Sequence, residues 1–205
     1  MKLVENISTE ELANIKRTIG EAFVTNELFH EFGTVEERRE AVIKYMDCYV
    51  QYVYEAKSLY QNESGTAYIG VCYSKEEQFW PQIKMLWGIL RAVPFKKLRR
   101  MLKQINENTA GNKVYTRHPY IEVLMVCVKK EAQGKGYSHE LVDFAKEMAK
   151  SHHCPLLFDT DMKAYADIYQ HFGCELYHQC TASNGVTRYN LVWEESFDSG
   201  KEAVK

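Results

Sequence analysis

Residues 126–138 read Val-Cys-Val-Lys-Lys-Glu-Ala-Gln-Gly-Lys-Gly-Tyr-Ser, and the interpretation of the whole chain starts from them. An apolar run ends at Val128, a short turn with Gly134 and Gly136 follows, and an amphipathic pattern begins after the second glycine. This order predicts a strand, a tight turn and a helix in immediate succession. The first N–H groups of a helix are unpaired and carry the positive end of its dipole, and glycines allow a close approach to the backbone. The stretch therefore predicts an anion site, such as one for the phosphates of a cofactor.

Two common phosphate-binding motifs do not fit this turn. A P-loop requires Ser or Thr after its lysine, but Gly136 follows Lys135. A dinucleotide-binding turn requires Gly or Ala at the position of His139. The turn instead resembles that of the GCN5-related N-acetyltransferase (GNAT) superfamily, in which Gln or Arg is followed by Gly three residues later and by Gly or Ala after two more. Gln133 and Gly136 match this pattern, and Ser138 departs from it.

The resemblance implies a site for acetyl-CoA. A turn that only connects strand and helix is the structural alternative, because short glycine motifs are common. By the resemblance, the end of the strand pairs with the pantetheine amides and the N–H groups of the turn hold the pyrophosphate. The residues implied are Val126, Cys127 and Val128 in the strand, and Gln133, Gly134, Lys135, Gly136, Tyr137 and Ser138 in the turn.

A second stretch, from Tyr169 to Cys174, resembles the family motif Y-x-x-x-G-F, in which three residues separate the tyrosine from a Gly-Phe pair. Cys174 replaces the phenylalanine, and the asparagine that often precedes the tyrosine is missing. The resemblance implies that Tyr169 lies near the thioester sulfur, where its phenol could protonate the departing thiolate. An aromatic side chain packed on a helix is the alternative interpretation, and Tyr165, one turn earlier, is the second candidate.

Glu122 is the candidate base, because it is a carboxylate within the apolar run 120–128. Such a position is costly unless the group is partnered or faces a cleft, and partial burial would raise its pKa towards neutrality. It also stands where the histone acetyltransferases of this superfamily carry their glutamate base. A solvated glutamate at a sheet edge, His118 as the base, or deprotonation through water are the alternatives.

The patterns on either side predict an α/β (α+β) fold. The Asn184-Gly185 pair is a strong hairpin signal, and the resemblance implies a central mixed, mostly antiparallel sheet flanked by helices. We expect one acetyltransferase domain over 1–205, with N-terminal helices in 1–57, a helical insertion in 76–108 and an acetyl-CoA-binding core in 118–193. The expected strands cover 59–62, 66–73, 120–128, 155–159, 174–182 and 186–193, and the expected helices begin at Ser8 and Thr34 or cover 136–150 and 162–172.

Residues 79–95 are unusually aromatic and exceed what the minimal fold needs. We interpret them as a lid or wall of the acceptor pocket, or as a helix packed on the core. The basic run 96–100 could contact the CoA 3′-phosphate or a membrane surface, but a solvated helix face is the interpretation we favour. The tail from Ser196 reads as a frayed terminus.

Composition excludes several classes of protein. A net charge of −2 argues against a nucleic-acid binder. The N-terminus lacks a signal peptide, and the apolar run 85–90 is too short to span a bilayer, so we expect a cytoplasmic protein without a membrane partner. None of the six cysteines forms a C-x-x-C pair, so free thiols are expected. Cys127 reads as a buried apolar residue rather than a nucleophile, and His152-His153-Cys154 as a helix end rather than a metal site.

The expected function is transfer of an acetyl group from acetyl-CoA to a primary amine, by direct attack in a ternary complex without a metal. The aromatic content favours an amine on a small molecule, and a homodimer is compatible with the sequence. The alternative from another class is a non-catalytic acyl-CoA sensor on the same fold, which the departures at Ser138 and Cys174 favour.

Overall fold

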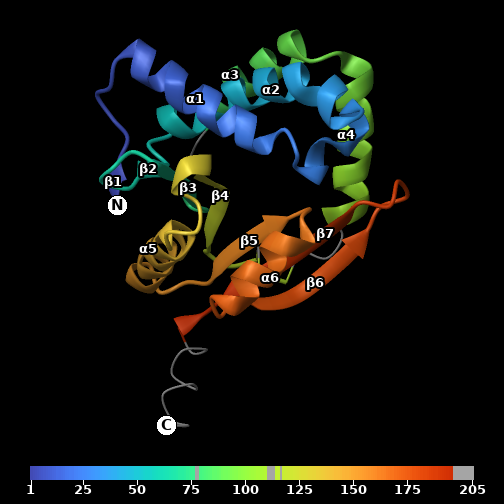
Figure 1. Ribbon diagram of the computed structural model, residues 1–205. Coiled ribbons are helices and arrows are strands. Elements are labelled where there is room, and N and C mark those ends of the chain that lie inside the picture. Colours follow the sequence, from blue (N-terminus) through green and yellow to red (C-terminus); the bar gives the residue numbers. More distant parts are fainter. Residues whose placement is uncertain (77–78, 110–113, 116, 196–205) are drawn as a thin grey trace.

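A seven-stranded sheet forms the middle layer of the computed structural model, which describes residues 1–76, 79–109, 114–115 and 117–195 (Figure 1). The strand order is β1-β2-β3-β4-β5-β7-β6. Only the β4–β5 pair is parallel, which confirms a mixed, mostly antiparallel sheet. The strands are β1 (Lys2–Leu3), β2 (Leu59–Gln61), β3 (Ala67–Tyr73), β4 (Ile121–Val128), β5 (Leu156–Thr160), β6 (Glu175–Thr181) and β7 (Thr187–Trp193).

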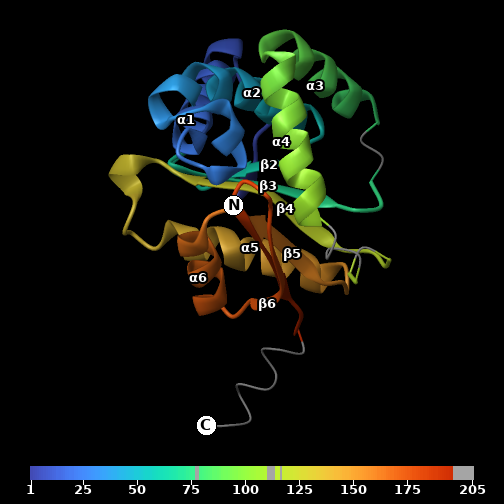
Figure 2. The same cartoon turned by 90° about the vertical axis from the view of Figure 1, so that its right-hand side faces the viewer.

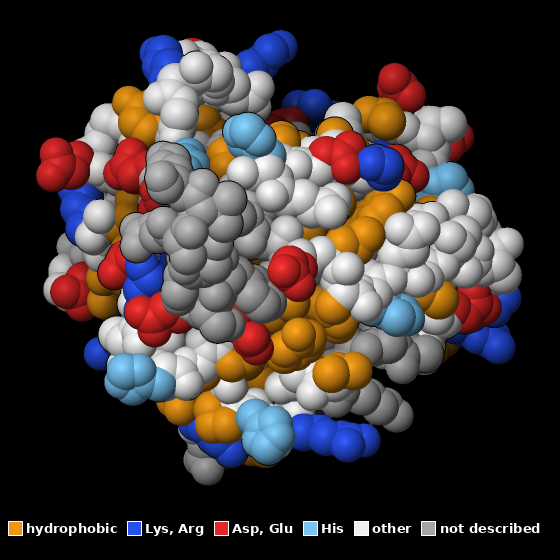
Figure 3. Space-filling view, turned by 90° about the horizontal axis from the view of Figure 1, so that it is seen from below, with side chains coloured by type: hydrophobic (Ala, Val, Ile, Leu, Met, Phe, Trp, Pro, Cys, Tyr) orange, Lys and Arg blue, Asp and Glu red, His pale blue; other side chains and the backbone are white. Residues whose placement is uncertain are grey.

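Helices cover both faces of this sheet (Figure 2). One face carries α1 (Thr9–Phe23), the 3₁₀ helix η1 (Glu27–Phe32), α2 (Val35–Glu55), α3 (Phe79–Ala92) and α4 (Phe95–Asn108), and the other carries α5 (Tyr137–Ser151) and α6 (Lys163–His171). Each face has its own apolar core, one around Phe29, Val42 and Met125 and one around Leu141, Phe158 and Trp193. Seen from below, the surface on the α5 and α6 side intersperses acidic, basic and histidine side chains (Figure 3).

The helix starts follow local capping chemistry. The Ser8 hydroxyl accepts a 3.1 Å hydrogen bond from the Glu11 N–H, and Thr34 and Glu37 form a reciprocal capping box at the start of α2. Pro94 is the N-cap of α4 and separates it from α3, so the expected helical insertion is two helices. The two-residue strand β1 and the helix η1 were not expected, because elements this short carry no periodic signal.

A β-bulge in β4 changes which side chains face each layer. Gly70 lies opposite Met125 and Val71 opposite Val123, so Leu124 has no partner on β3. Before the bulge, Val123 belongs to the α5-side core; after it, Met125 belongs to the core under α1 and α2. The bulge disturbs the regular ladder at the middle of the sheet, next to the cavity described below.

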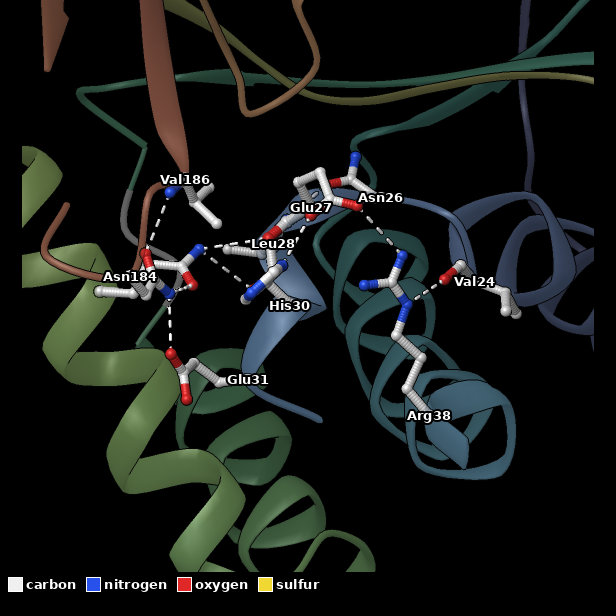
Figure 4. A network of polar contacts seen from close by, with 10 residues as sticks. Val24, Asn26, Glu27, Leu28, His30, Glu31, Arg38, Asn184 and Val186 are labelled. Atoms are coloured by element: carbon white, nitrogen blue, oxygen red, sulfur yellow. Dashed lines mark hydrogen bonds and ion pairs between the residues drawn. The ribbon is translucent and has the colours of Figure 1, made fainter. Parts of the chain in front are cut away.

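The tip of the β6–β7 hairpin is anchored to the helical layer (Figure 4). The Asn184 side-chain amide donates to Glu31 Oε1 at 2.8 Å and to Gln104 Oε1 at 2.7 Å, and its oxygen accepts from the Val186 N–H. In the same view, the buried Arg38 donates to the Val24 carbonyl at 2.7 Å. The hairpin is thus fixed against η1 and α4, which holds β7 beside the functional region.

Candidate functional site

The turn before α5 exposes a row of backbone donors. Gly134 and Gly136 have φ values of +76° and +82°, a region that favours glycine. An added Cβ at either position would meet nothing within 4 Å, so it is the backbone conformation that calls for glycine here. Within the described part of the chain, the N–H groups of residues 134–138 have no hydrogen-bond acceptor. Because α5 begins directly afterwards, the positive end of its dipole points to the same place, and the turn can hold an anion.

The strand that leads into this turn separates from its neighbour. β4 pairs with β5 only from Ile121 to Val123, but it pairs with β3 as far as Val128. One edge of residues 124–128 therefore has no strand partner among the described residues. An open strand edge can form β-type hydrogen bonds with the amides of an extended ligand.

A cavity of about 810 Å³ opens where the two strands separate. Its volume lies within the range of small-molecule and cofactor sites. The strand residues Val126, Cys127 and Val128 line it, as does Gln133, whereas residues 134–138 of the turn do not. The other walls come from the end of α1 and the segment after it, from β5 and from α6, and include Thr18, Glu21, Phe23, Asn26, Phe158, Asp159, Thr160, Tyr165 and Tyr169.

Tyr169 reaches this cavity from α6. Its ring packs on the Phe158 ring with centroids 4.6 Å apart. Burial raises the pKa of the Tyr169 phenol above its ordinary value, so the group stays protonated at neutral pH and can only donate its proton. Tyr165 also lines the cavity but is 44% exposed. Tyr169 is thus a partly buried aromatic side chain that packs on the core and also lines the cavity.

Glu122 lies on the sheet face under α2. Burial, reinforced by the negative charge of Asp159 and opposed by Arg188, raises the pKa of the Glu122 carboxyl from 4.5 to about 7. No hydrogen bond to its carboxylate forms within the described part of the chain. Glu122 is absent from the cavity lining, but Asp159, whose charge raises its pKa, lines the cavity. A carboxyl group with this pKa can exchange a proton near neutral pH.

The sequence did not single out the polar cluster beside Glu122. Asp159 on β5 lies opposite Asn190 on β7, which donates to it at 2.5 Å. Arg188 lies two residues before Asn190, so it is on the same face of β7, and it binds Asp161 through two hydrogen bonds of 3.1 and 2.8 Å. The alternation of Arg188 and Asn190 in β7 was a sequence signal for this cluster. Only the pairing of β7 with β5 shows that these side chains meet Asp159 and Asp161.

Aromatic side chains of α2 cover this cluster. Tyr45 and Tyr49 stack with centroids 6.4 Å apart, and Tyr49 and Tyr52 are 6.0 Å apart. The Tyr49 hydroxyl donates to the Leu124 carbonyl at 3.4 Å, on the bulge itself. Burial is the largest cause of the raised pKa of Tyr49, followed by the charge of Glu122. Carboxylates among tyrosine rings form an environment that favours a cation.

The remaining candidates lie elsewhere or are inert. His118 is exposed in the segment before β4. Burial raises the pKa of the Cys127 thiol to about 12, so the thiolate is not accessible at neutral pH. His152 packs on the Tyr73 ring at 4.4 Å. The described residues contain no group of three or more His, Cys, Asp or Glu side chains that could hold a metal, and none of their helices is long and apolar enough to cross a membrane.

Comparisons with known proteins agree with this architecture. The acetyltransferase (GNAT) family matches residues 88–174. No curated protein sequence matches the chain significantly. Three solved structures share the fold over nearly the whole chain.

The first is the C-terminal condensation domain of Ebony in complex with β-alanyl-dopamine, with 7% identity, coverage of 94% of this chain and 98% of that chain, and a TM-score of 0.63. Arylalkylamine N-acetyltransferase 2 from Aedes aegypti shares 13% identity over 92% of this chain and 95% of that chain, with a TM-score of 0.52. An N-acetyltransferase from Staphylococcus aureus Mu50 shares 13% identity over 94% and 100%, with a TM-score of 0.55. At these identities the similarity concerns the fold.

Proposed function

From the match of residues 88–174 to the acetyltransferase (GNAT) family, we propose that the chain is an acyltransferase. It transfers the acetyl group of acetyl-CoA to the primary amine of a small molecule by direct attack in a ternary complex. The observation that carries the proposal is the cavity lined at once by the open end of β4, by Asp159 beside Glu122, and by Tyr169. We further propose that residues 1–205 form one domain and act without a metal or a nucleic-acid partner.

The features around the glycine turn support acetyl-CoA as the acyl donor. The unpaired N–H groups of residues 134–138 suit the pyrophosphate, and glycines with positive φ allow it to approach the backbone. The open edge of Val126, Cys127 and Val128 suits the pantetheine amides. Gln133 supports the turn by donating from its side chain to the Val128 carbonyl at 3.4 Å.

The polar cluster beside the cavity supports an amine as the acceptor. Glu122 and Asp159 are both partly buried carboxylates with a raised pKa, and desolvation is the largest cause for each. A cationic ammonium group would relieve this cost, and the rings of Tyr45 and Tyr49 offer it aromatic faces. Of the solved structures that share this fold, one is an arylalkylamine N-acetyltransferase and another is a condensation domain in complex with β-alanyl-dopamine.

The proposed mechanism assigns a role to each of these residues. When bound, acetyl-CoA supplies a thioester carbonyl as the electrophile. Glu122, which lies beside Asp159 of the cavity wall, is the final acceptor of the proton that the bound ammonium loses, so that a neutral amine can attack. Backbone N–H groups at the open end of β4 stabilise the negative charge that develops on oxygen. Tyr169, held protonated at neutral pH, donates its proton to the departing sulfur as the carbon–sulfur bond breaks, and it regains a proton from the nitrogen that has attacked.

An amine panel tests this function. Purified protein is mixed with acetyl-CoA and, one at a time, arylalkylamines, aliphatic diamines, amino acids and a lysine peptide, and the released thiol of CoA and the mass of the product are measured. We expect acetylation of at least one small amine. Release of CoA without an acetylated amine, or acetylation of the peptide alone, would contradict the proposal, and tight acetyl-CoA binding without turnover would instead favour a non-catalytic sensor.

A further inference from the structure

Helix α3 has two apolar faces, but only one of them packs on the protein. On the inner face, Ile89 is 6% exposed and Gly88 lies so close to α2 that an added Cβ would come within 2.9 Å of the Cys48 sulfur. This close packing fixes α3 on α2. Ordinary surface helices present polar residues on the opposite side.

The outer face of α3 is instead apolar and exposed. Phe79, Leu86 and Leu90 recur at helical spacing, and Trp80 and Trp87 lie beside them. The exposed fractions are 62% for Phe79, 70% for Trp80, 52% for Leu86, 60% for Trp87 and 52% for Leu90. The three aromatic side chains alone expose on the order of 400 Å², which approaches the largest patch of a typical monomer.

Helix α4, which follows α3 after Pro94, also exposes apolar side chains, and both helices are rich in basic residues. Phe95 and Leu102 are 70% and 53% exposed, and Arg99 lies between them on the same side of α4. The sequence from 79 to 106 contains no Asp or Glu, but it contains seven basic residues, namely Lys84, Arg91, Lys96, Lys97, Arg99, Arg100 and Lys103.

Several of these cations have no acidic partner. Lys84 pairs with Glu55 and Lys103 with Glu107, and Lys97 donates to the Phe32 carbonyl. Among the described residues, no carboxylate pairs with Arg91, Lys96, Arg99 or Arg100. This is a local excess of positive charge in a chain whose net charge is −2. The opposite face of the molecule mixes both signs (Figure 3).

We propose that the outer face of α3 and the first turns of α4 bind the surface of a lipid bilayer that contains anionic lipids. Tryptophan and phenylalanine side chains with flanking lysines and arginines are the composition of helices that lie in the bilayer interface. Positive charges attract anionic headgroups, which a purely apolar contact with a second copy of this chain would not require. Both helices lie at the outer side of the helical layer (Figures 1 and 2). This proposal differs from the expectation of no membrane partner, and it does not depend on the proposed function.

The three tryptophans of the chain make the test specific. Trp80 and Trp87 are exposed on the proposed face, whereas Trp193 is fully buried. The full chain is mixed with vesicles of phosphatidylcholine, with and without phosphatidylglycerol, and sedimentation and tryptophan emission are recorded. We expect binding and a blue shift with the anionic vesicles only, both weakened by salt.

Two double variants test the contacts. Trp80→Gln with Trp87→Gln should abolish both signals. Arg91→Gln with Arg99→Gln should lower the partition coefficient about 25-fold, at about fivefold per charge. The matched control removes two exposed positive charges on α2, Arg39→Gln with Lys44→Gln, and should bind as the wild type does.

Four results would overturn the proposal. They are absence of binding by folded wild-type protein, equal binding to neutral vesicles, equal loss of binding in the control variant, and a lipid-free dimer that the tryptophan variant cannot form. The last result would assign the face to a second copy of the chain.

Discussion

Arg188 binds Asp161 through two hydrogen bonds, of 3.1 and 2.8 Å, while its nearest approach to Asp159 is 4.0 Å. The guanidinium therefore interacts mainly with Asp161, although three carboxylates lie around it. Burial raises the pKa of both Asp159 and Glu122, and Arg188 only partly opposes the effect. The negative charge of this cluster is therefore only partly balanced by Arg188. We assign the further positive charge to the ammonium form of the acceptor amine.

The pH dependence of turnover should follow Glu122. Because its pKa is raised to about 7, the carboxylate that accepts a proton is the minor form below pH 7. We expect kcat/KM for the amine to rise with pH through about 7 and then level off, until the amine itself titrates. Steady-state rates between pH 5.5 and 9 measure this, and Glu122→Gln should remove this limb together with most of the activity, about 100-fold or more.

Asp159→Asn serves as the partner variant for this experiment. Removing a negative charge that raises the pKa of Glu122 should move the same limb to lower pH. A profile that stays unchanged in both variants would show that another group or water acts as the base.

The free energy of unfolding should also depend on the ionisation of the Glu122 carboxyl group. A folded-state pKa of about 7, against 4.5 ordinarily, means that below pH 4.5 the group is neutral in both states and costs nothing. As the pH rises from 4.5 to 7, the unfolded chain ionises first, so the free energy of unfolding falls. The loss reaches about 3 kcal/mol above pH 7. Glu122→Gln should therefore match the wild type near pH 4 and be more stable by that amount at pH 8, measured by urea unfolding.

Tyr169→Phe should separate chemistry from binding. The Tyr169 ring packs on Phe158 and its phenol stays protonated at neutral pH, so loss of the hydroxyl removes a proton donor and little packing. We expect kcat to fall about 100-fold, with the dissociation constant for acetyl-CoA within about twofold of wild type. Tyr165→Phe, on the more exposed neighbour in the cavity wall, is the control and should change kcat little. A larger effect from Tyr165→Phe would exchange the two roles.

Two glycines with the same backbone conformation allow a matched test of the turn. Gly136 and Gly185 have φ values of +82° and +88°, and an added Cβ meets nothing within 4 Å at either. Alanine should therefore destabilise the fold by a similar amount in both variants, about 1 kcal/mol. Only Gly136→Ala should also weaken acetyl-CoA binding, because its strain lies in the turn proposed to hold the phosphates. The expected loss of affinity is about tenfold. Equal affinities in the two variants would place the phosphates elsewhere.

Local signals predicted most of the elements. The Ser8 and Thr34 caps start α1 and α2, and Asn184-Gly185 turns the β6–β7 hairpin. The place of β7 between β5 and β6 follows from long-range pairing, which no local pattern encodes. The bulge at Leu124 was equally hidden, because β4 reads as a regular apolar strand.

The candidate site was predictable only in part. The glycine turn and Tyr169 carry motifs, and Glu122 stood out as a charge in an apolar run. The cluster of Asp159, Arg188 and Asn190 forms only when β5 pairs with β7. The contact between Tyr49 and Leu124 joins residues 75 positions apart in the sequence, so no local pattern predicts either. The exposure of the outer face of α3 was not predicted, because its apolar residues were interpreted as a pocket wall or as a helix packed on the core.

The most direct test of the central claim is a calorimetric titration of the chain with acetyl-CoA, CoA, ATP and NAD. The account predicts saturable 1:1 binding of acetyl-CoA and CoA, weak or absent binding of ATP and NAD, and loss of affinity in a folded Gly136→Pro variant, because proline cannot adopt a positive φ. Absence of acetyl-CoA binding by well-folded protein, or equal binding of ATP and NAD, would contradict it.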